Sequence, residues 1–405
     1  MLNIGWIDFS KEHQKRVRDV LNLLKKSGAV DELGIGVLRD RFADRLFPGT
    51  STIQTRAKYF FIVPWIIRNL EKEGFSGEKF ANELARREVQ MVNVLWKPGV
   101  RGIIGAESGE ALQRKPSEIY WSGLRAYNIF RYPQMSLGQY LRVAGKAAIR
   151  LSGDFQKDPS GEDASISGED VIGPFWNIPP PPDTWPDQTP IHLTFDEAEF
   201  LKERIVTAPG SKDSLWAHLL KSFPGEARDR EHFFGLQDLV KEMPPEVQED
   251  YRLANDFARL IRGAHIRYNC IFFKQANLPE MVEVHQEKWE DWALEMRGFP
   301  FKNWNVDALF ERLAMGSSQA HRSIRAFLKK WTQVAADING TDLEGLDNYL
   351  MQREEILKGR ERAKLRNPLD HIRKDTTWIG IEHLDFRWSN IRWLLDDMVQ
   401  AWGSG

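Results

Sequence analysis

The stretch Phe47-Pro48-Gly49-Thr50-Ser51-Thr52-Ile53-Gln54-Thr55-Arg56-Ala57-Lys58-Tyr59-Phe60-Phe61 joins a hydroxyl-rich turn to a dense apolar segment. Pro48-Gly49 is a turn pair, and Ser51 followed three residues later by Gln54 fits a capping box. A helix is therefore expected to begin near Thr52 and to run to about Lys72, with Pro64 kinking or dividing it. Its apolar residues lie on all sides, which predicts the buried central helix of the first domain.

The predicted helix start also suggests an anion site. A helix N-terminus presents unpaired backbone N–H groups and the positive end of the helix dipole. The polar residues near it are Thr50, Ser51, Thr52, Arg56 and Lys58. Two compatible interpretations stay open: these residues only cap the helix and hold the turn, or they also contact phosphate or nucleic acid. A Walker loop is excluded, because its spaced glycines and Gly-Lys-Ser/Thr ending are missing.

Length and composition narrow the class of protein. A chain of 405 residues suits about two or three domains. The single cysteine, Cys270, excludes an internal disulfide or a cysteine zinc site and favours a reducing, cytoplasmic location. The N-terminus shows no signal-peptide pattern, and the longest strongly apolar run, Tyr59 to Ile67, is too short to span a bilayer. No membrane association is therefore expected.

Charge is distributed unevenly along the chain. Residues 1–150 hold 25 Lys and Arg against 15 Asp and Glu, whereas residues 151–255 hold 9 against 21. The basic first segment favours a nucleic-acid partner. The acidic segment that follows could instead neutralise it by packing alongside, or could mask it.

The first 150 residues are predicted to form a basic helical domain. A short extended segment is expected at 3–9, and helices are expected at about 11–26, 35–46, 52–72, 76–96 and 116–124, with another from 136. A glycine-bounded hairpin from Gly102 to Gly109 would make the pattern compatible with a winged helix. In that arrangement a DNA-facing surface would be lined by Arg114, Lys115, Arg125 and Arg131. Gly102-Ile103-Ile104-Gly105 could also suggest a KH loop, but its two isoleucines favour an ordinary turn.

Residues 151–192 form an acidic linker rich in Pro and Gly, and they mark the clearest domain boundary. The linker is predicted to be flexible from Gly153 to Asp170. Its second half is predicted to pack on a surface through Phe175, Trp176, Ile178 and Trp185. The whole chain is thus expected to be mainly α with minor β, and residues 193–405 to form a helical bundle. Helices are predicted there at about 195–206, 211–222, 229–241, 245–275, 279–297, 305–313, 318–337, 342–365 and 386–402.

No catalytic, metal-binding or cofactor motif emerges from the spacing. The histidines lack the pairings of zinc sites, and Cys270 lies in an apolar context typical of core. His371 and Asp375 are four residues apart, but the sequence around them does not predict a regular helix. Carboxylate clusters at 287–291, 354–355 and 396–397 read as solvated helix faces, with a metal-dependent nuclease as the alternative.

The densest basic cluster comprises Arg353, Lys358, Arg360, Arg362, Lys364 and Arg366. At helical spacing these positions spread around the axis, which indicates either a solvated helix or contact with nucleic acid or an acidic partner. Many tryptophans crowd the last third of the chain, among them Trp289, Trp292, Trp304, Trp331, Trp378, Trp388 and Trp393. Most are expected in the core, and some could anchor a protein interface.

Five motifs carry a family resemblance: Ile4-Gly5-Trp6-Ile7-Asp8-Phe9, Asp31-Glu32-Leu33-Gly34-Ile35-Gly36, Phe47 to Phe61, Pro116 to Trp121, and Leu384-Asp385-Phe386-Arg387-Trp388. Together they resemble a bacterial domain-of-unknown-function family of about this length. None of the motifs has an assigned chemical role. The resemblance implies accessory proteins encoded beside helicases and phospholipase-D-like nucleases in anti-phage defence islands.

These observations lead to one hypothesis and two alternatives. The hypothesis is a non-catalytic subunit of an anti-phage complex that contacts DNA or RNA and a helicase or nuclease partner. The first alternative is a metal-dependent nuclease with an unfamiliar site. The second is a stand-alone winged-helix regulator, which should bind one promoter sequence far more tightly than bulk DNA.

Overall fold

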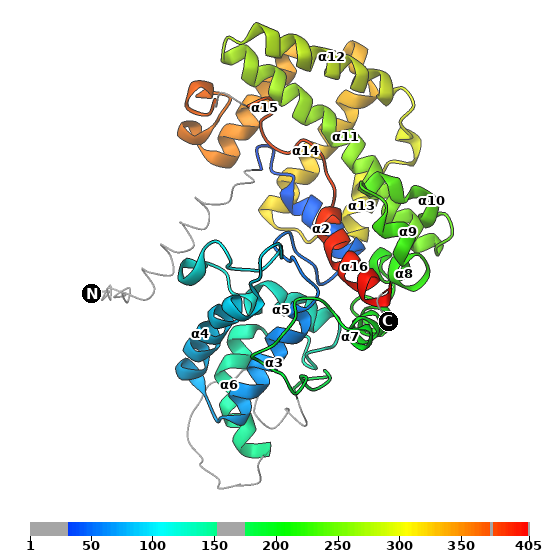
Figure 1. Ribbon diagram of the computed structural model, residues 1–405. Helices are drawn as coiled ribbons and strands as arrows, with labels where there is room; N and C mark the ends of the chain where they lie inside the picture. The colour runs from blue at the N-terminus through cyan, green and yellow to red at the C-terminus, as the bar shows by residue number, and fades with distance from the viewer. Residues whose placement is uncertain (1–30, 152–174, 373–375, 404–405) are drawn as a thin grey trace, which may run out of the picture. The chain divides into compact units, whose positions relative to one another are not determined.

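The computed structural model describes residues 31–151, 175–372 and 376–403, which are mainly helical (Figure 1). Within these ranges the β structure is an isolated antiparallel bridge between Phe130 and Trp176. The expected mainly α fold is confirmed. The extended segment and helix predicted at 3–9 and 11–26 lie outside the described residues. No helix in the described ranges has the length and apolar character needed to cross a membrane.

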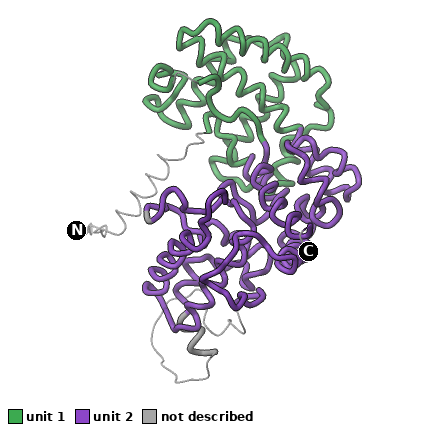
Figure 2. The backbone as a smooth tube through the Cα atoms, in the orientation of Figure 1, with its two compact units in different colours: residues 1–38, 256–384 green, residues 39–255, 385–405 purple. Residues whose placement is uncertain are grey.

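The chain divides into two compact units, each assembled from segments that are distant in sequence (Figure 2). Unit 1 comprises residues 1–38 and 256–384, and unit 2 comprises residues 39–255 and 385–405. Helices α2 (Gly36–Leu46) and α11 (Pro245–Gln275) contribute residues to both. These bounds differ from the three consecutive segments expected from sequence, because helical periodicity does not reveal which distant segments pack together.

Helix α3 (Tyr59–Lys72) is buried on nearly all sides in unit 2, and Pro64 lies within it. It packs against α4 (Gly77–Leu95), α5 (Pro116–Ala126) and α6 (Leu137–Leu151). The prediction of a buried central helix ending at Lys72 is confirmed.

The chain between residues 175 and 193 packs on unit 2. Trp176 is buried and its Nε1 donates to Glu71 Oε1 at 3.2 Å, while Trp65 Nε1 donates to the Pro179 carbonyl at 3.0 Å. The rings of Trp65 and Trp185 lie 5.2 Å apart. The predicted packing of the second half of the linker is confirmed, whereas its first half, 153–170, lies outside the described residues.

The remaining helices of unit 2 surround this centre. Helix α16 (Trp388–Gly403) packs on α7 (Phe195–Thr207) and α9 (Pro224–Arg228). The other elements are α8 (Leu215–Ser222), η2 (Phe233–Leu236) and α10 (Gln237–Val240). Sequence predicted single helices at 211–222 and 229–241, and each is shorter or divided.

Unit 1 is organised around tryptophan rings between helices. It contains the second part of α11 together with α12 (Pro279–Met296), α13 (Val306–Arg312), α14 (Gln319–Ala336) and α15 (Leu343–Lys358). Trp292 lies 5.0 Å from Trp289 and 5.7 Å from Trp331 between ring centroids. All three are buried, so the prediction that most tryptophans lie in the core is confirmed here.

Residues 101–112 form turns and the 3-10 helix η1 (Gly109–Ala111) instead of the paired strands that a winged helix requires. Gly102 and Gly105 adopt φ values of 79° and 92°, which reverse the chain without a ladder. Ile103 and Ile104 are buried, and the Ile104 N–H donates to Tyr59 Oη at 2.9 Å. The segment is thus an ordinary turn anchored to α3, and the predicted hairpin is wrong.

Candidate nucleic-acid interface

The turn after Phe47 is closed by internal hydrogen bonds in unit 2. Thr50 Oγ1 donates to the Phe47 carbonyl at 2.6 Å, and Thr50 is buried. Gln54 is fully buried, and its side-chain amide donates to the Ile119 carbonyl of α5 at 3.3 Å. Helix α3 begins at Tyr59, so the predicted capping box and the helix start near Thr52 are wrong. The reason is that the Gln54 side chain points inward to α5, not back to Ser51.

Two buried ion pairs follow this turn. Arg56 Nη2 lies 2.7 Å from Asp397 Oδ1 of α16, and Lys58 Nζ lies 2.6 Å from Glu197 Oε1 of α7. Burial raises the pKa of Asp397 and lowers the pKa of Lys58. Arg56 and Lys58 therefore have internal carboxylate partners. The anion site expected at this turn lacks the solvent-facing cations that it requires.

The start of α16 also holds the turn. Arg387 Nη1 donates to the Thr50 carbonyl at 2.7 Å and lies 2.8 Å from Asp44 Oδ1. Asn390 Nδ2 donates to the Thr52 and Gln54 carbonyls, each at 3.1 Å. Thr52 has an exposed side chain, but its backbone is fixed by these contacts. The turn is thus a structural junction between the first and last segments of unit 2.

The basic residues predicted around α5 have different environments. Arg114 and Arg131 are exposed, whereas Lys115 and Arg125 are half-buried. Arg125 Nη1 donates to the Pro133 carbonyl at 3.0 Å, which fixes its side chain along the turn after α5. Arg114 and Arg131 are the members of this set whose side chains face solvent fully.

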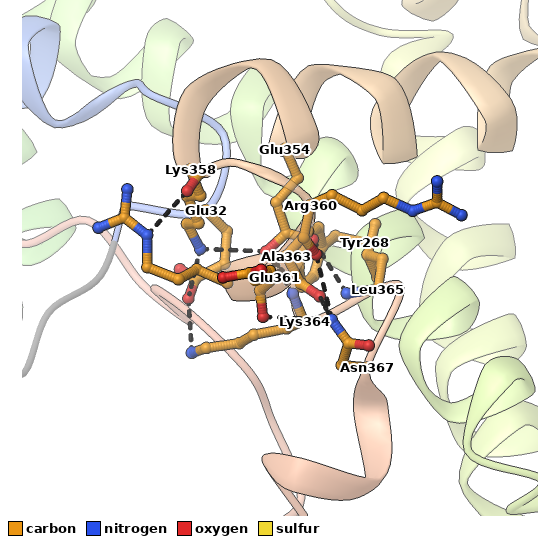
Figure 3. Close-up of polar contacts among 11 residues, drawn as sticks. Glu32, Tyr268, Glu354, Lys358, Arg360, Glu361, Ala363, Lys364, Leu365 and Asn367 are labelled. Carbon is orange, nitrogen blue, oxygen red and sulfur yellow. Dashed lines mark hydrogen bonds and ion pairs between the residues drawn. The ribbon is translucent and has the colours of Figure 1, made fainter.

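In unit 1, the C-terminal basic run surrounds a buried carboxylate (Figure 3). Glu354 is fully buried on α15, and its Oε1 accepts hydrogen bonds from Tyr268 Oη at 2.7 Å and from Lys358 Nζ at 3.1 Å. The backbone N–H groups of Lys364 and Leu365 donate to the same carboxylate at 3.1 and 3.0 Å. Burial and the adjacent Glu354 charge raise the pKa of Tyr268, which keeps this phenol protonated as a donor.

A second buried carboxylate, Glu32, completes the cluster. Lys364 Nζ lies 2.7 Å from Glu32 Oε1, and Lys358 Nζ lies 3.4 Å from the same oxygen. Lys358 therefore bridges Glu32 and Glu354. The two lysines balance the two carboxylates, as buried charges require. We call these residues, with Tyr268, the Glu354 cluster.

The Glu354 cluster fixes the loop that follows α15. The helix ends at Lys358 because Gly359 adopts φ of 80°, and η5 (Arg360–Arg362) follows. The helix predicted to reach residue 365 is therefore wrong at its C-terminal end. Asn367 Nδ2 donates to the Arg360, Glu361 and Ala363 carbonyls at 3.1, 3.3 and 3.3 Å. These contacts define the backbone of the loop on both sides of Arg362.

The four basic residues predicted here as nucleic-acid contacts divide into two pairs. Lys364 and Arg366 form ion pairs with Glu32 and Glu355. Arg360 and Arg362 are exposed and form no ion pair within the described residues. Arg362 Nε donates to the Lys358 carbonyl at 2.8 Å, and the Arg360 side chain extends away from the Glu354 cluster (Figure 3). Arginine guanidinium groups on a fixed backbone suit phosphate contacts.

Sequence reasoning missed the acidic partners that organise these sites. Glu354 and Asp397 read as solvated helix faces, yet both are buried. Glu32, Glu197 and Tyr268 carried no pattern that pointed to Lys364, Lys58 or Glu354. Their separation along the chain, up to several hundred residues, leaves no local signal to find them. In the described part of the chain, no group of three or more His, Cys, Asp or Glu residues could hold a metal ion.

A family model described as a family of unknown function (DUF6361) matches residues 1–402. The chain therefore belongs to this family, and the resemblance drawn from its motifs is confirmed. Comparisons with curated proteins and with solved structures each gave no match. The family is described as one of unknown function, so the geometry of the sites is the basis for a proposed function.

Proposed function

We propose that this member of the DUF6361 family is a non-catalytic subunit of a bacterial anti-phage assembly that contacts nucleic-acid phosphates. Its partners would be a helicase, a phospholipase-D-like nuclease, or both, which would hydrolyse ATP and cut nucleic acid. The partner classes come from the resemblance of its motifs to accessory proteins of defence islands. The contact with nucleic acid is supported by the geometry of unit 1.

The observation that carries the proposal is the fixed presentation of Arg360 and Arg362. Their neighbours Lys364 and Arg366 form ion pairs with Glu32 and Glu355, whereas these two arginines are exposed and form no ion pair within the described residues. Because the Asn367 amide and the Glu354 cluster already order the loop, little backbone conformational entropy would be lost when phosphate binds. Arg114 and Arg131 of unit 2 would add sequence-independent contacts of the same kind.

The assignment of catalysis to partner proteins is supported by two of the acidic residues, Glu354 and Asp397. The carboxylates considered for a nuclease include Glu354 and Asp397, and each is engaged by internal donors. A catalytic carboxylate that binds a divalent cation needs free oxygen atoms directed at the metal. These two groups instead hold the fold.

The test is the salt dependence of nucleic-acid binding, measured by fluorescence anisotropy with labelled duplex DNA, single-stranded DNA and RNA. Each phosphate contact contributes about 0.9 to the slope of log K against log salt concentration for duplex DNA. Arg360→Glu with Arg362→Glu should therefore weaken binding and lower the slope by about 2. The reduction should be similar for different sequences, because phosphate contacts carry no base information.

A matched control changes the same charge elsewhere on unit 1. Arg297 and Lys302 are exposed, and the double variant Arg297→Glu with Lys302→Glu should leave the slope near that of the wild type. The proposal fails if wild-type protein shows no salt-sensitive binding, or if both double variants lose binding equally. Metal-dependent cleavage of the probe by purified protein would favour the nuclease alternative.

A further inference from the structure

Helix α12 has two faces of different character. Its inner face buries His285, Trp289, Trp292 and Met296, which recur every three or four residues. Gly263 of α11 leaves room for this face, because a Cβ atom there would lie 2.2 Å from the Trp292 ring. Close packing against α11 therefore fixes which face of α12 is buried and which face is exposed.

The outer face of α12 combines apolar and acidic side chains. Val284 and Leu294 are 44% and 60% exposed. The exposed acidic residues on the same face are Glu280, Glu283, Glu287, Glu290 and Asp291. Positions 280, 284, 287, 291 and 294 follow alternating steps of four and three, which form one continuous seam along a helix.

The acidic residues of this face lack cationic partners among the residues that the structure describes. By contrast, Glu295 on the flank of the helix lies 2.7 Å from Arg259, and Asp307 of α13 lies 2.6 Å from Lys329. Gln286 Nε2 donates to Glu290 Oε1, which is a neutral contact. The five exposed carboxylates of the outer face of α12 therefore form a continuous run of negative charge.

We propose that the outer face of α12 docks a basic amphipathic helix of a partner protein. Val284 and Leu294 would contact its apolar stripe, and the flanking carboxylates would meet its Lys and Arg residues. The seam spacing favours a helix over an extended strand, because facing helices match side chains at steps of three and four. The charge selects a basic partner and disfavours direct contact with nucleic acid.

A second copy of the chain is a poorer occupant. The basic helix of unit 1 is α14, and its Arg325 and Lys329 already face Asp307 of the same unit at 3.8 and 2.6 Å. Those cations would have to leave an internal partner before they could meet α12 of another copy. The inference rests on the proposed function in one respect: the outer face of α12 is the site at which a partner subunit would bind.

The test uses a synthetic amphipathic peptide as long as α12, 18 residues, with a leucine seam flanked by lysines. Binding to the full chain is measured by anisotropy of the labelled peptide. The double variant Glu287→Lys with Asp291→Lys should weaken binding by about tenfold or more, and Leu294→Ser should weaken it independently. Asp183→Lys with Asp187→Lys, the same charge change on exposed residues of unit 2, should not weaken it.

Two results would overturn the proposal. One is equal weakening by the α12 and control variants, which would indicate general charge attraction. The other is a concentration-dependent dimer in sedimentation velocity that the α12 variants abolish, which would identify a second copy as the occupant. The α12 variants leave Arg360 and Arg362 unchanged, so loss of peptide binding with normal nucleic-acid binding separates this proposal from the proposed function.

Discussion

Charged residues in the interior of this protein are held by partners that are distant in sequence. Arg56 pairs with Asp397, Lys58 pairs with Glu197, and Lys364 pairs with Glu32. A buried charge costs several kcal/mol unless it has a hydrogen-bonded partner of opposite sign. Each pair therefore makes the fold depend on bringing together one specific pair of distant segments.

Arg56→Ala should destabilise the protein by about 3–5 kcal/mol, because it leaves Asp397 buried without its cation. Adding Asp397→Asn should recover part of that loss, since the uncompensated charge is then gone while the Ala57 N–H keeps an acceptor. Urea denaturation of both single variants and the double variant measures the coupling. Additive effects of the two changes would contradict a direct pair.

Glu88 of α4 gives stability a pH dependence of its own. Its carboxyl group accepts hydrogen bonds from the backbone N–H and the side-chain hydroxyl of Ser117 at the start of α5, and burial raises its pKa from 4.5 to about 8. The folded state thus keeps a proton that the unfolded state loses as pH rises from 4.5 to 8. The free energy of unfolding should fall across this window, by at most about 1.4 kcal/mol per pH unit.

Glu88→Gln isolates this contribution, because an amide stays neutral at every pH in the window. Its unfolding free energy should depend less steeply on pH than that of the wild type between pH 5 and pH 8. Denaturation curves at several pH values compare the two slopes. Parallel pH profiles would show that Glu88 titrates normally in the folded state.

Helices whose apolar residues recur regularly were predictable to within about two residues. Sequence placed helices at 245–275, 279–297 and 318–337, and α11, α12 and α14 match them closely. The predictions were wrong at helix ends where one residue departs from the local helical pattern. Gln54 points into α5, which delays α3 to Tyr59, and Gly359 in the left-handed region ends α15 before the basic run.

Close packing between α11 and α12 makes Gly263 a sensitive position. An added Cβ would lie 2.2 Å from the Trp292 ring, so Gly263→Ala should destabilise by about 1–3 kcal/mol despite the better helix propensity of alanine. Gly138 in α6 has no atom within 4 Å of an added Cβ. Gly138→Ala should therefore be neutral or stabilising by up to about 1 kcal/mol.

Thermal unfolding of these two glycine variants compares the effect of helix propensity on stability with the effect of side-chain packing. Gly263→Ala should lower the midpoint temperature, and Gly138→Ala should raise it or leave it unchanged. Equal shifts for both would show that α12 can move away from α11 at little cost.

The organisation of the whole molecule was the least predictable level. The chain forms two units from interleaved segments, and residues 385–405 return to unit 2 after unit 1 is complete. Composition identified the basic beginning, the proline-rich stretch at 151–192, which lies inside unit 2, and the basic run near the C-terminus. It could not show that Arg56, Lys58, Lys364 and Arg366 would be neutralised internally, because their partners carry no local signal. Of the predicted nucleic-acid contacts, Arg114, Arg131, Arg360 and Arg362 are exposed cations that form no ion pair within the described residues.

The measurement that tests the central claim most directly is purification of the protein from its native host, with the partners identified by mass spectrometry. The proposed function predicts that the protein copurifies in fixed stoichiometry with a helicase or a phospholipase-D-like nuclease, and that nucleic acid is recovered with the complex. A protein that purifies without either partner, or that cleaves nucleic acid by itself, would contradict the claim.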